Sequence, residues 1–197
     1  MFGISSDVGC WMLVLLIFPM PETTVILDAT AIQRALTRIA HEIVERNENG
    51  VEVVLVGIPT GGVPLAQRLG KILAEIWKHA VPTGSLDVSM HRDDLDQRAA
   101  PKIHPTLMPF DVNGKTVVLV DDVLFSGRTI RAAMDALNDF GRPKKIQLAV
   151  LVDRGHRELH IRADFVGKNT PTALDEKISL RLVESGAAQD EALLQKK

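Results

Sequence analysis

Residues 116–130 read TVVLVDDVLFSGRTI, and this stretch decides the fold class. The apolar, β-branched run at 117–120 is typical of a buried strand, and two adjacent carboxylates, Asp121 and Asp122, follow it directly. A Ser-Gly-Arg-Thr turn comes next, and an amphipathic segment begins behind it. A strand, a tight turn and a helix start in this order predict a strand–helix unit of an α/β protein.

The same stretch predicts a binding site for a phosphorylated sugar. Backbone N–H groups of such a turn, aimed from a helix N-terminus, bind phosphate. Acidic side chains directly before the turn can accept hydrogen bonds from sugar hydroxyls. Recognition of a phosphate and a diol side by side indicates a ribose 5-phosphate group. The alternative is an ordinary turn with two solvated aspartates, although a bare turn does not need the acidic pair.

The rest of the chain alternates apolar runs of strand type with segments of helical periodicity. We expect strands at 25–27, 51–56, 86–90, 117–120, 146–152, 164–168 and 178–183. We expect helices at 31–46 after an Asp28 cap, from Pro64 onward, and at 130–140. The polar stretch 91–106 has no periodicity and is typical of a functional loop. This alternation predicts a mostly parallel sheet with helices on both faces.

Composition restricts the classes of function. The chain has 197 residues, of which 46% are hydrophobic and 24% charged, which suits one globular domain with a real core. The net charge of −2 gives no overall attraction to nucleic acid or membrane, so any RNA contact needs a local basic patch. The single cysteine, Cys10, excludes an internal disulfide and fits a reducing, cytoplasmic location.

The two ends of the chain differ from the rest. The apolar run at 11–18 is far shorter than the about 20 residues that a membrane helix needs, and a signal peptide fits poorly. We therefore expect residues 1–20 to be an unstructured extension, with Met20 as the functional start. A membrane-surface anchor is the alternative. The globular domain is expected at 21–184, and residues 185–197 are expected to form a frayed C-terminal tail.

The stretch 116–130 resembles the phosphoribosyl-pyrophosphate (PRPP) signature of the type I phosphoribosyltransferases. Further segments are similar to one branch of that family, the bacterial attenuation regulators of the pyrimidine operon that are also uracil phosphoribosyltransferases. These segments are LTRIAHEIVE at 36–45, RDDL at 92–95, LVDRGHREL at 151–159 and IRADFVGKN at 161–169. The resemblance extends from about residue 25 to 183.

The resemblance implies a fold and a function. The fold would be a mostly parallel twisted sheet with flanking helices and a small hood made from distant segments. The reaction would convert uracil and PRPP to UMP and pyrophosphate, with Mg²⁺ held mainly by PRPP. The resemblance also implies binding to a stem-loop of the leader mRNA, strengthened by UMP or UTP. It further implies homo-oligomers, either dimers or larger assemblies.

The resemblance also implies roles for individual residues. Asp121, Asp122 and Arg92 would be catalytic, with Arg92 as a cation for pyrophosphate. PRPP would contact Thr60, Gly61, Gly62, Asp121, Asp122, Val123, Leu124, Phe125, Ser126, Gly127, Arg128 and Thr129. The base would contact Arg154, Val166 and Lys168. RNA would contact Thr37, Arg38, His41, His156, Arg157 and Arg162. Without the resemblance, Arg92 would be a surface residue, Val166 plain core and the basic residues a solvated turn.

Three positions depart from the family pattern. Gly61 stands where the pyrophosphate loop usually has arginine, His91 stands in place of a tyrosine before Arg92, and His160 stands in place of a proline. The first two departures suggest an alternative, an RNA-binding regulator whose catalysis has decayed. A phosphoribosyltransferase for another base, such as a purine, is a second alternative. A generic nucleotide-binding α/β protein is the third.

Overall fold

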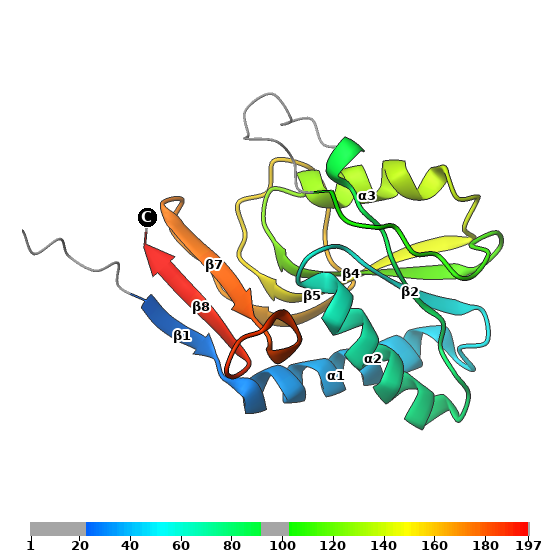
Figure 1. Cartoon of the computed structure of the whole chain (residues 1–197), viewed down its shortest axis with the longest axis horizontal. Helices are drawn as coiled ribbons and strands as arrows, with labels where there is room; N and C mark the ends of the chain where they lie inside the picture. The colour runs from blue at the N-terminus through cyan, green and yellow to red at the C-terminus, as the bar shows by residue number, and fades with distance from the viewer. Residues whose placement is uncertain (1–22, 92–102, 197) are drawn as a thin grey trace, which may run out of the picture.

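A computed structural model describes residues 23–91 and 103–196 (Figure 1). Its central sheet has five strands, all parallel, in the order β3-β2-β4-β5-β6. Their bounds are Val53–Gly57 (β2), Thr83–Ser85 (β3), Thr116–Leu124 (β4), Lys145–Asp153 (β5) and Phe165–Asn169 (β6). The chain moves from β2 outward to β3 and then returns to β4. Ligands of open α/β sheets bind at the carboxyl ends of strands where the order reverses in this way.

Helices cover both faces of the sheet (Figure 1). The first face carries α1 (Ala29–Asn47) and α2 (Gly62–Trp77), and the second carries α3 (Arg128–Asn138). Alternate residues of β4 point to the two cores: Val118 packs with α1 and α2, whereas Leu119 packs with α3. Because both faces are covered, the strands are apolar along their length, as the sequence predicts.

A second, smaller sheet forms the hood. It contains β1 (Thr23–Leu27), β7 (Glu176–Arg181) and β8 (Glu191–Lys196), antiparallel in the order β1-β8-β7. The predicted α/β architecture with a small hood is therefore confirmed. The expectation of a frayed tail after residue 184 is wrong for β8, which is the middle strand of the hood with Ala192 and Leu193 buried. Pairing with the preceding strand β7 and with the distant strand β1 orders this segment, whose own sequence is too short to show a pattern.

Local predictions vary in accuracy. Asp28 caps α1 as predicted, because its Oδ1 accepts a hydrogen bond from the Ala31 N–H at 2.7 Å. The strand predicted at 86–90 is wrong. The strand is β3, three residues earlier in the chain, and Ser89–His91 forms a short 3₁₀ helix. The apolar signal at Leu86 and Val88 reflects burial in the core beside α3 rather than strand pairing.

Several predictions fall outside the described residues. They concern the extension at 1–20 and most of the loop at 91–106, including Arg92. Within 23–91 and 103–196, no helix is long and apolar enough to cross a bilayer.

The end of α2 carries a pH-sensitive contact. The His79 ring stacks on Trp77 with centroids 5.9 Å apart. Its Nδ1 lies 3.2 Å from the carbonyl oxygen of Ala80, and its Nε2 lies 3.1 Å from that of Asn49. Both nitrogens can donate only when the ring is protonated. The hydrogen bond to the Asn49 carbonyl, followed by that to Ala80, therefore raises the pKa of His79.

We expect this contact to stabilise the fold in acid and not in alkali. A raised folded-state pKa adds stability below the unfolded pKa, and this stability is lost as the pH rises through the folded-state value. His79→Gln should therefore lower the melting temperature more at about pH 5.5 than at about pH 8.5. Equal deficits at the two pH values would contradict this account of His79.

Candidate active site

A cavity of about 680 Å³ opens where β2 and β4 end, at the point where the strand order reverses. It is lined by the continuous run 121–130, by Pro59 and Thr60, by Arg154 and Glu158, and by Lys177 and Ile178. The structure thus brings Thr60, the whole predicted run 121–129 and Arg154 together. Lys177 and Ile178 belong to strand β7 of the hood, and their place in the cavity wall was not predicted.

The acidic pair lies inside β4, which continues to Leu124, rather than after the strand as the sequence suggests. Asp121 is buried, and its Oδ1 accepts a hydrogen bond from the Asp122 N–H at 2.9 Å. The Oδ1 of Asp122 accepts one from the Val123 N–H at 2.8 Å. These bonds orient both side chains through the neighbouring backbone, so the two carboxylates line the cavity in defined positions.

The predicted phosphate loop leads into α3. Gly127 has φ +92°, in the left-handed region that glycine adopts without strain, and the chain enters α3 immediately after it. Gly127 is the N-cap residue of α3 and has no side chain that could cap the helix. Arg128, Thr129 and Ile130, in the first turn of α3, line the cavity. The N-terminus of α3 therefore presents its dipole and backbone N–H groups to the cavity, which is the arrangement that binds phosphate.

Arg157 holds this loop from within the protein. Its Nη1 donates to the carbonyl oxygens of Phe125 at 2.7 Å and Gly155 at 3.0 Å, and its Nη2 pairs with Asp153. Its Nε donates to the Ile161 carbonyl oxygen at 2.9 Å. The side chain is only 22% exposed. Arg157, which the resemblance assigns to RNA, therefore supports the phosphate loop in this structure.

The loop between β2 and α2 packs directly on β4. A Cβ atom on Gly62 would lie 2.2 Å from the Val120 carbonyl oxygen, and one on Gly61 would lie 2.4 Å from Oδ2 of Asp122. Gly61 and Gly62 support the cavity wall, whereas Thr60 lines it. Glycine at position 61 thus allows close contact between the predicted pyrophosphate loop and the acidic pair.

Arg154 lies at the end of the cavity that faces the hood. It is buried, with its Nε 3.0 Å from Thr172 Oγ1 and its Nη2 3.1 Å from the Ala173 carbonyl oxygen. Its guanidinium lies 4.2 Å from the centre of the Phe125 ring, a cation–π contact. Burial lowers the pKa of Arg154, and the charge of Glu176 opposes this effect. The arginine is therefore a fixed cation beside Phe125.

The other two predicted base residues, Val166 and Lys168, are not among the residues that line this cavity. The Val166 carbonyl oxygen accepts a hydrogen bond from Arg38 at 3.1 Å, and the Lys168 Nζ donates to the Ile26 carbonyl oxygen at 3.0 Å. Lys177 and Ile178 of the hood occupy the wall of the cavity instead. The sequence could not reveal them, because the run around them shows only an ordinary strand pattern and its position depends on the hood.

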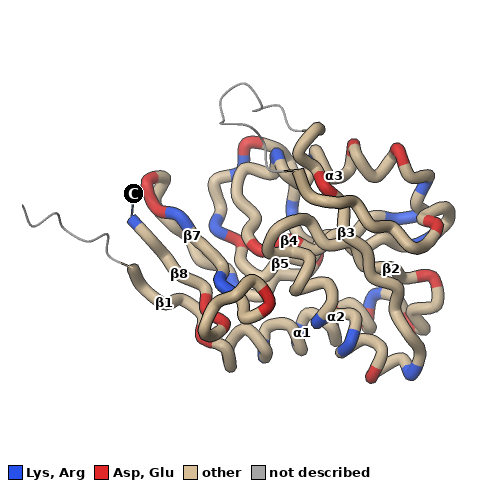
Figure 2. Tube along the Cα trace, in the orientation of Figure 1, with Lys and Arg blue, Asp and Glu red and all other residues tan. Residues whose placement is uncertain are grey.

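Apart from Arg157, the predicted RNA residues lie on α1 or in the connection from β5 to the edge strand β6. Thr37, Arg38 and His41 lie on α1, which packs against β6, and Arg38 also donates to the Gly167 carbonyl oxygen at 2.5 Å. Arg162 is an exposed residue that precedes β6 in the chain. The His156 ring contacts the carbonyl oxygen of Thr172, which follows β6. These residues therefore share the β6 region rather than one compact cluster. Figure 2 shows that acidic and basic residues are interspersed along the trace.

The acidic pair has the chemistry to bind Mg²⁺ together with a phosphorylated substrate. Among the described residues, no group of three or more His, Cys, Asp or Glu side chains could hold a metal by itself. Mg²⁺ usually keeps several waters and is bound by one or two carboxylates together with substrate phosphates. Asp121 and Asp122 supply such carboxylates at the wall of the cavity.

Comparisons with known proteins agree with this site. Residues 22–177 match the phosphoribosyl transferase domain family. The hypoxanthine phosphoribosyltransferase of Trypanosoma cruzi shares the fold with a TM-score of 0.66 at 17% identity, over 88% of this chain and 97% of that one. A hypoxanthine-guanine phosphoribosyltransferase of Bacillus anthracis has a TM-score of 0.60 at 21% identity, over 75% and 84%. The chain therefore belongs to the phosphoribosyltransferase family.

Its curated relatives define the branch. The bifunctional protein PyrR of Roseiflexus sp. is 62% identical over 84% of this chain and 91% of the relative. The bifunctional protein PyrR of Listeria monocytogenes is 53% identical over 90% of this chain and 99% of the relative. Within its family the chain thus groups with the bifunctional PyrR proteins, and the family predicted from the sequence is confirmed.

Proposed function

We propose that the protein is a transcriptional attenuation regulator of pyrimidine biosynthesis that also makes UMP and pyrophosphate from uracil and PRPP. One observation carries the catalytic part: the acidic pair of β4 and the N-terminus of α3 line the same cavity. The regulatory part rests on similarity to the bifunctional PyrR proteins. It includes binding of leader mRNA that depends on UMP or UTP, by a protein that forms dimers or larger assemblies.

PRPP would lie along the cavity with its three groups at separate places. The 5′-phosphate would accept hydrogen bonds from the backbone and hydroxyls of residues 126–129 at the start of α3. The ribose hydroxyls would donate to Asp121 and Asp122. The pyrophosphate would lie against residues 60–62, with Arg92 as an additional cation. Backbone N–H groups donate many of the hydrogen bonds to phosphate in such a loop, and glycine keeps its N–H, so Gly61 is compatible with pyrophosphate binding.

The chemistry requires stabilisation of charge. The bond between C1′ and the pyrophosphate oxygen breaks with its electron pair leaving on pyrophosphate, and C1′ gains oxocarbenium character. The carboxylates of Asp121 and Asp122 would stabilise this positive charge. Uracil N1 then bonds to C1′, and the N1 proton passes to the departing pyrophosphate or to water. Mg²⁺ bound with PRPP would supply positive charge near the departing pyrophosphate.

Uracil would bind between Phe125 and the hood. Arg154 is fixed beside Phe125 by Thr172 and Ala173, so its guanidinium can donate to a uracil carbonyl oxygen without losing side-chain entropy. Lys177 and Ile178 would close the pocket from β7. The contact of Val166 and Lys168 with the base stays a prediction from the resemblance, and both residues make hydrogen bonds to other parts of the protein.

The experiment that tests this function is a turnover assay with a panel of bases. Purified protein would be incubated with PRPP, Mg²⁺ and either uracil, orotate or hypoxanthine. We expect product with uracil alone. No turnover from protein that still binds UMP would favour the regulator with decayed catalysis. Turnover with hypoxanthine would favour a phosphoribosyltransferase for another base.

The RNA-binding part gives a separate prediction. Arg162 is exposed before β6 and lies outside the cavity, so Arg162→Ala should weaken binding to the protein's own pyrimidine leader transcript and leave UMP formation unchanged. Loss of one phosphate contact should reduce the slope of log affinity against log salt by about 1. Lys71→Ala, an exposed lysine on α2, is the control. Equal weakening by both variants would contradict a specific role for Arg162.

A further inference from the structure

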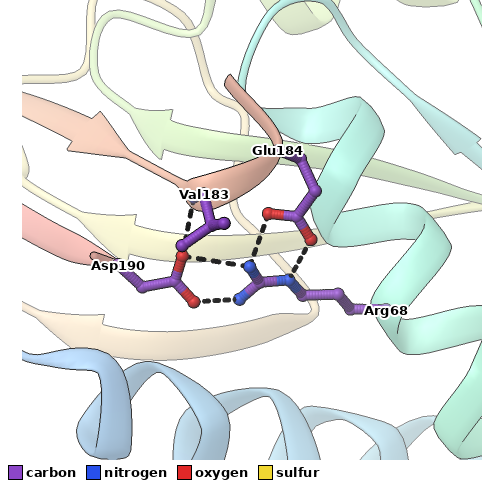
Figure 3. A network of polar contacts seen from close by, with 4 residues as sticks. All are labelled: Arg68, Val183, Glu184 and Asp190. Carbon is purple, nitrogen blue, oxygen red and sulfur yellow. Dashed lines mark hydrogen bonds and ion pairs between the residues drawn. The ribbon is translucent and has the colours of Figure 1, made fainter. Parts of the chain in front are cut away.

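Arg68 joins helix α2 to the hood through two acidic residues. Arg68 on α2 donates through Nε and Nη2 to the two carboxylate oxygens of Glu184, at 2.7 and 2.6 Å (Figure 3). It also donates through Nη1 and Nη2 to the two oxygens of Asp190, at 2.5 and 3.0 Å. Asp190 in turn accepts the Val183 N–H at 3.0 Å. Both acidic residues lie in the connection from β7 to β8, so we call this cluster the Arg68 bridge.

The bridge is a strong and specific contact. Its arginine and Asp190 are 19% and 14% exposed, so solvent screens this pair less than a surface pair. Forked bonds between a guanidinium and a carboxylate fix orientation as well as distance. The hydrogen bonds from Arg68 lower the pKa of both Glu184 and Asp190. Without the arginine, two neighbouring carboxylates would face each other, and the charge of Asp190 already acts to raise the pKa of Glu184.

The two ends of the bridge are connected to opposite sides of the active site. On the core side, α2 begins at Gly62, the last residue of the proposed pyrophosphate loop. On the hood side, β7 carries Lys177 and Ile178, which line the cavity at the proposed uracil end. Apolar packing of Ile178, Leu182 and Ala192 also holds the hood on the core. Such packing is non-directional, whereas the forked bonds define one position.

We propose that Arg68 is a positioning residue for phosphoribosyl transfer, which holds β7 at the distance from the pyrophosphate loop that lets uracil and PRPP bind together. This inference rests on the proposed function, because it needs uracil to bind at the hood. Arg68 itself does not line the cavity and acts through the elements that do.

Steady-state kinetics of Arg68→Ala test the functional consequence. We expect the KM for uracil to rise about tenfold, because small displacements of a binding wall have large effects. The KM for PRPP should change less than about twofold, because the core forms that part of the site. Arg68→Lys should fall between wild type and Arg68→Ala, since an ammonium keeps the charge but cannot fork. A merely structural role would instead lower the active fraction and leave both KM values unchanged, which would overturn the proposal.

Arg181→Ala is the matched control. This substitution removes an ion pair between Arg181 and Glu191, whose charged groups are 3.3 Å apart. The pair joins β7 to β8 within the hood and does not connect the hood to α2. We expect both KM values to stay at the wild-type level. A rise in the uracil KM equal to that of Arg68→Ala would overturn the proposal, because it would show that general loosening of the hood is sufficient.

Hydrogen exchange of the ligand-free protein separates this inference from the proposed function. Arg68→Ala should increase exchange in β7 and β8 and leave β4 and β5 unchanged. Unchanged exchange in the hood would overturn the proposal. Wild-type protein that forms no UMP would overturn the proposed function, and hydrogen exchange would still decide whether Arg68 holds the hood.

Discussion

Replacing Asp122 with asparagine is expected to lower kcat for UMP formation by about 10²- to 10³-fold, the effect of removing one preorganised electrostatic group. Asparagine has the same shape, and its side-chain oxygen can still accept the Val123 N–H that Asp122 accepts at 2.8 Å. The fold should therefore persist while the charge near C1′ is lost. Single-turnover rates with saturating PRPP and uracil would measure the effect, and circular dichroism would confirm folding.

A second aspartate provides the control for this prediction. Asp135→Asn removes a carboxylate of α3 that pairs on the surface with Arg131 at 3.8 Å and lies outside the cavity. We expect wild-type activity from it, because exposed ion pairs contribute little. If Asp122→Asn also retained activity close to wild type, the charge of Asp122 would have no role in the chemistry.

Gly62→Ala is expected to cause the second large loss. The new Cβ atom would lie 2.2 Å from the Val120 carbonyl oxygen and 3.1 Å from the Asp121 Cα. Both are backbone atoms of a central strand, so the loop before α2 must move. Such overpacking typically costs about 1–3 kcal/mol of stability. A displacement of about 1 Å in a reacting group can cost about 10²-fold in rate. Melting temperature and kcat/KM for PRPP would measure the two effects.

Gly70→Ala is the matched control in the same helix. Its Cβ atom would meet a side-chain methyl of Thr83 at 2.7 Å, which can move, and the next neighbours lie at 3.6 Å or more. Alanine also favours helix over glycine. We expect near wild-type activity from Gly70→Ala. Full activity from Gly62→Ala would show that the loop is not packed on β4 as described.

The sequence predicts best what is local. The strand, the acidic pair and the turn before α3 are contiguous, so their order alone predicts that Asp121, Asp122 and the turn 126–129 form one site, and all of these residues line the cavity. The Asp28 cap is also local, because the donor lies three residues away. The alternation of strands and helices predicts the parallel sheet, since short connections restrict the topology.

The sequence predicts poorly what depends on distant pairing. The strand β8 pairs on one side with the preceding strand β7, and on the other with β1, which is far away in the chain. Lys177 enters the cavity only because the hood folds back over β4. Arg157 looks like a surface cation in the sequence, yet backbone carbonyl oxygens brought near by folding bind its guanidinium. The role of Arg68 is likewise hidden in the sequence, because its partners Glu184 and Asp190 are more than a hundred positions away.

The central claim is that the cavity below the hood is the PRPP and nucleotide site. A crystal structure of the protein with UMP tests it most directly. We predict the 5′-phosphate within about 3 Å of backbone N–H groups at residues 127–129. The ribose hydroxyls should contact Asp121 and Asp122, and the base should lie between Arg154 and Ile178. UMP bound elsewhere, or with its phosphate away from the start of α3, would contradict the account.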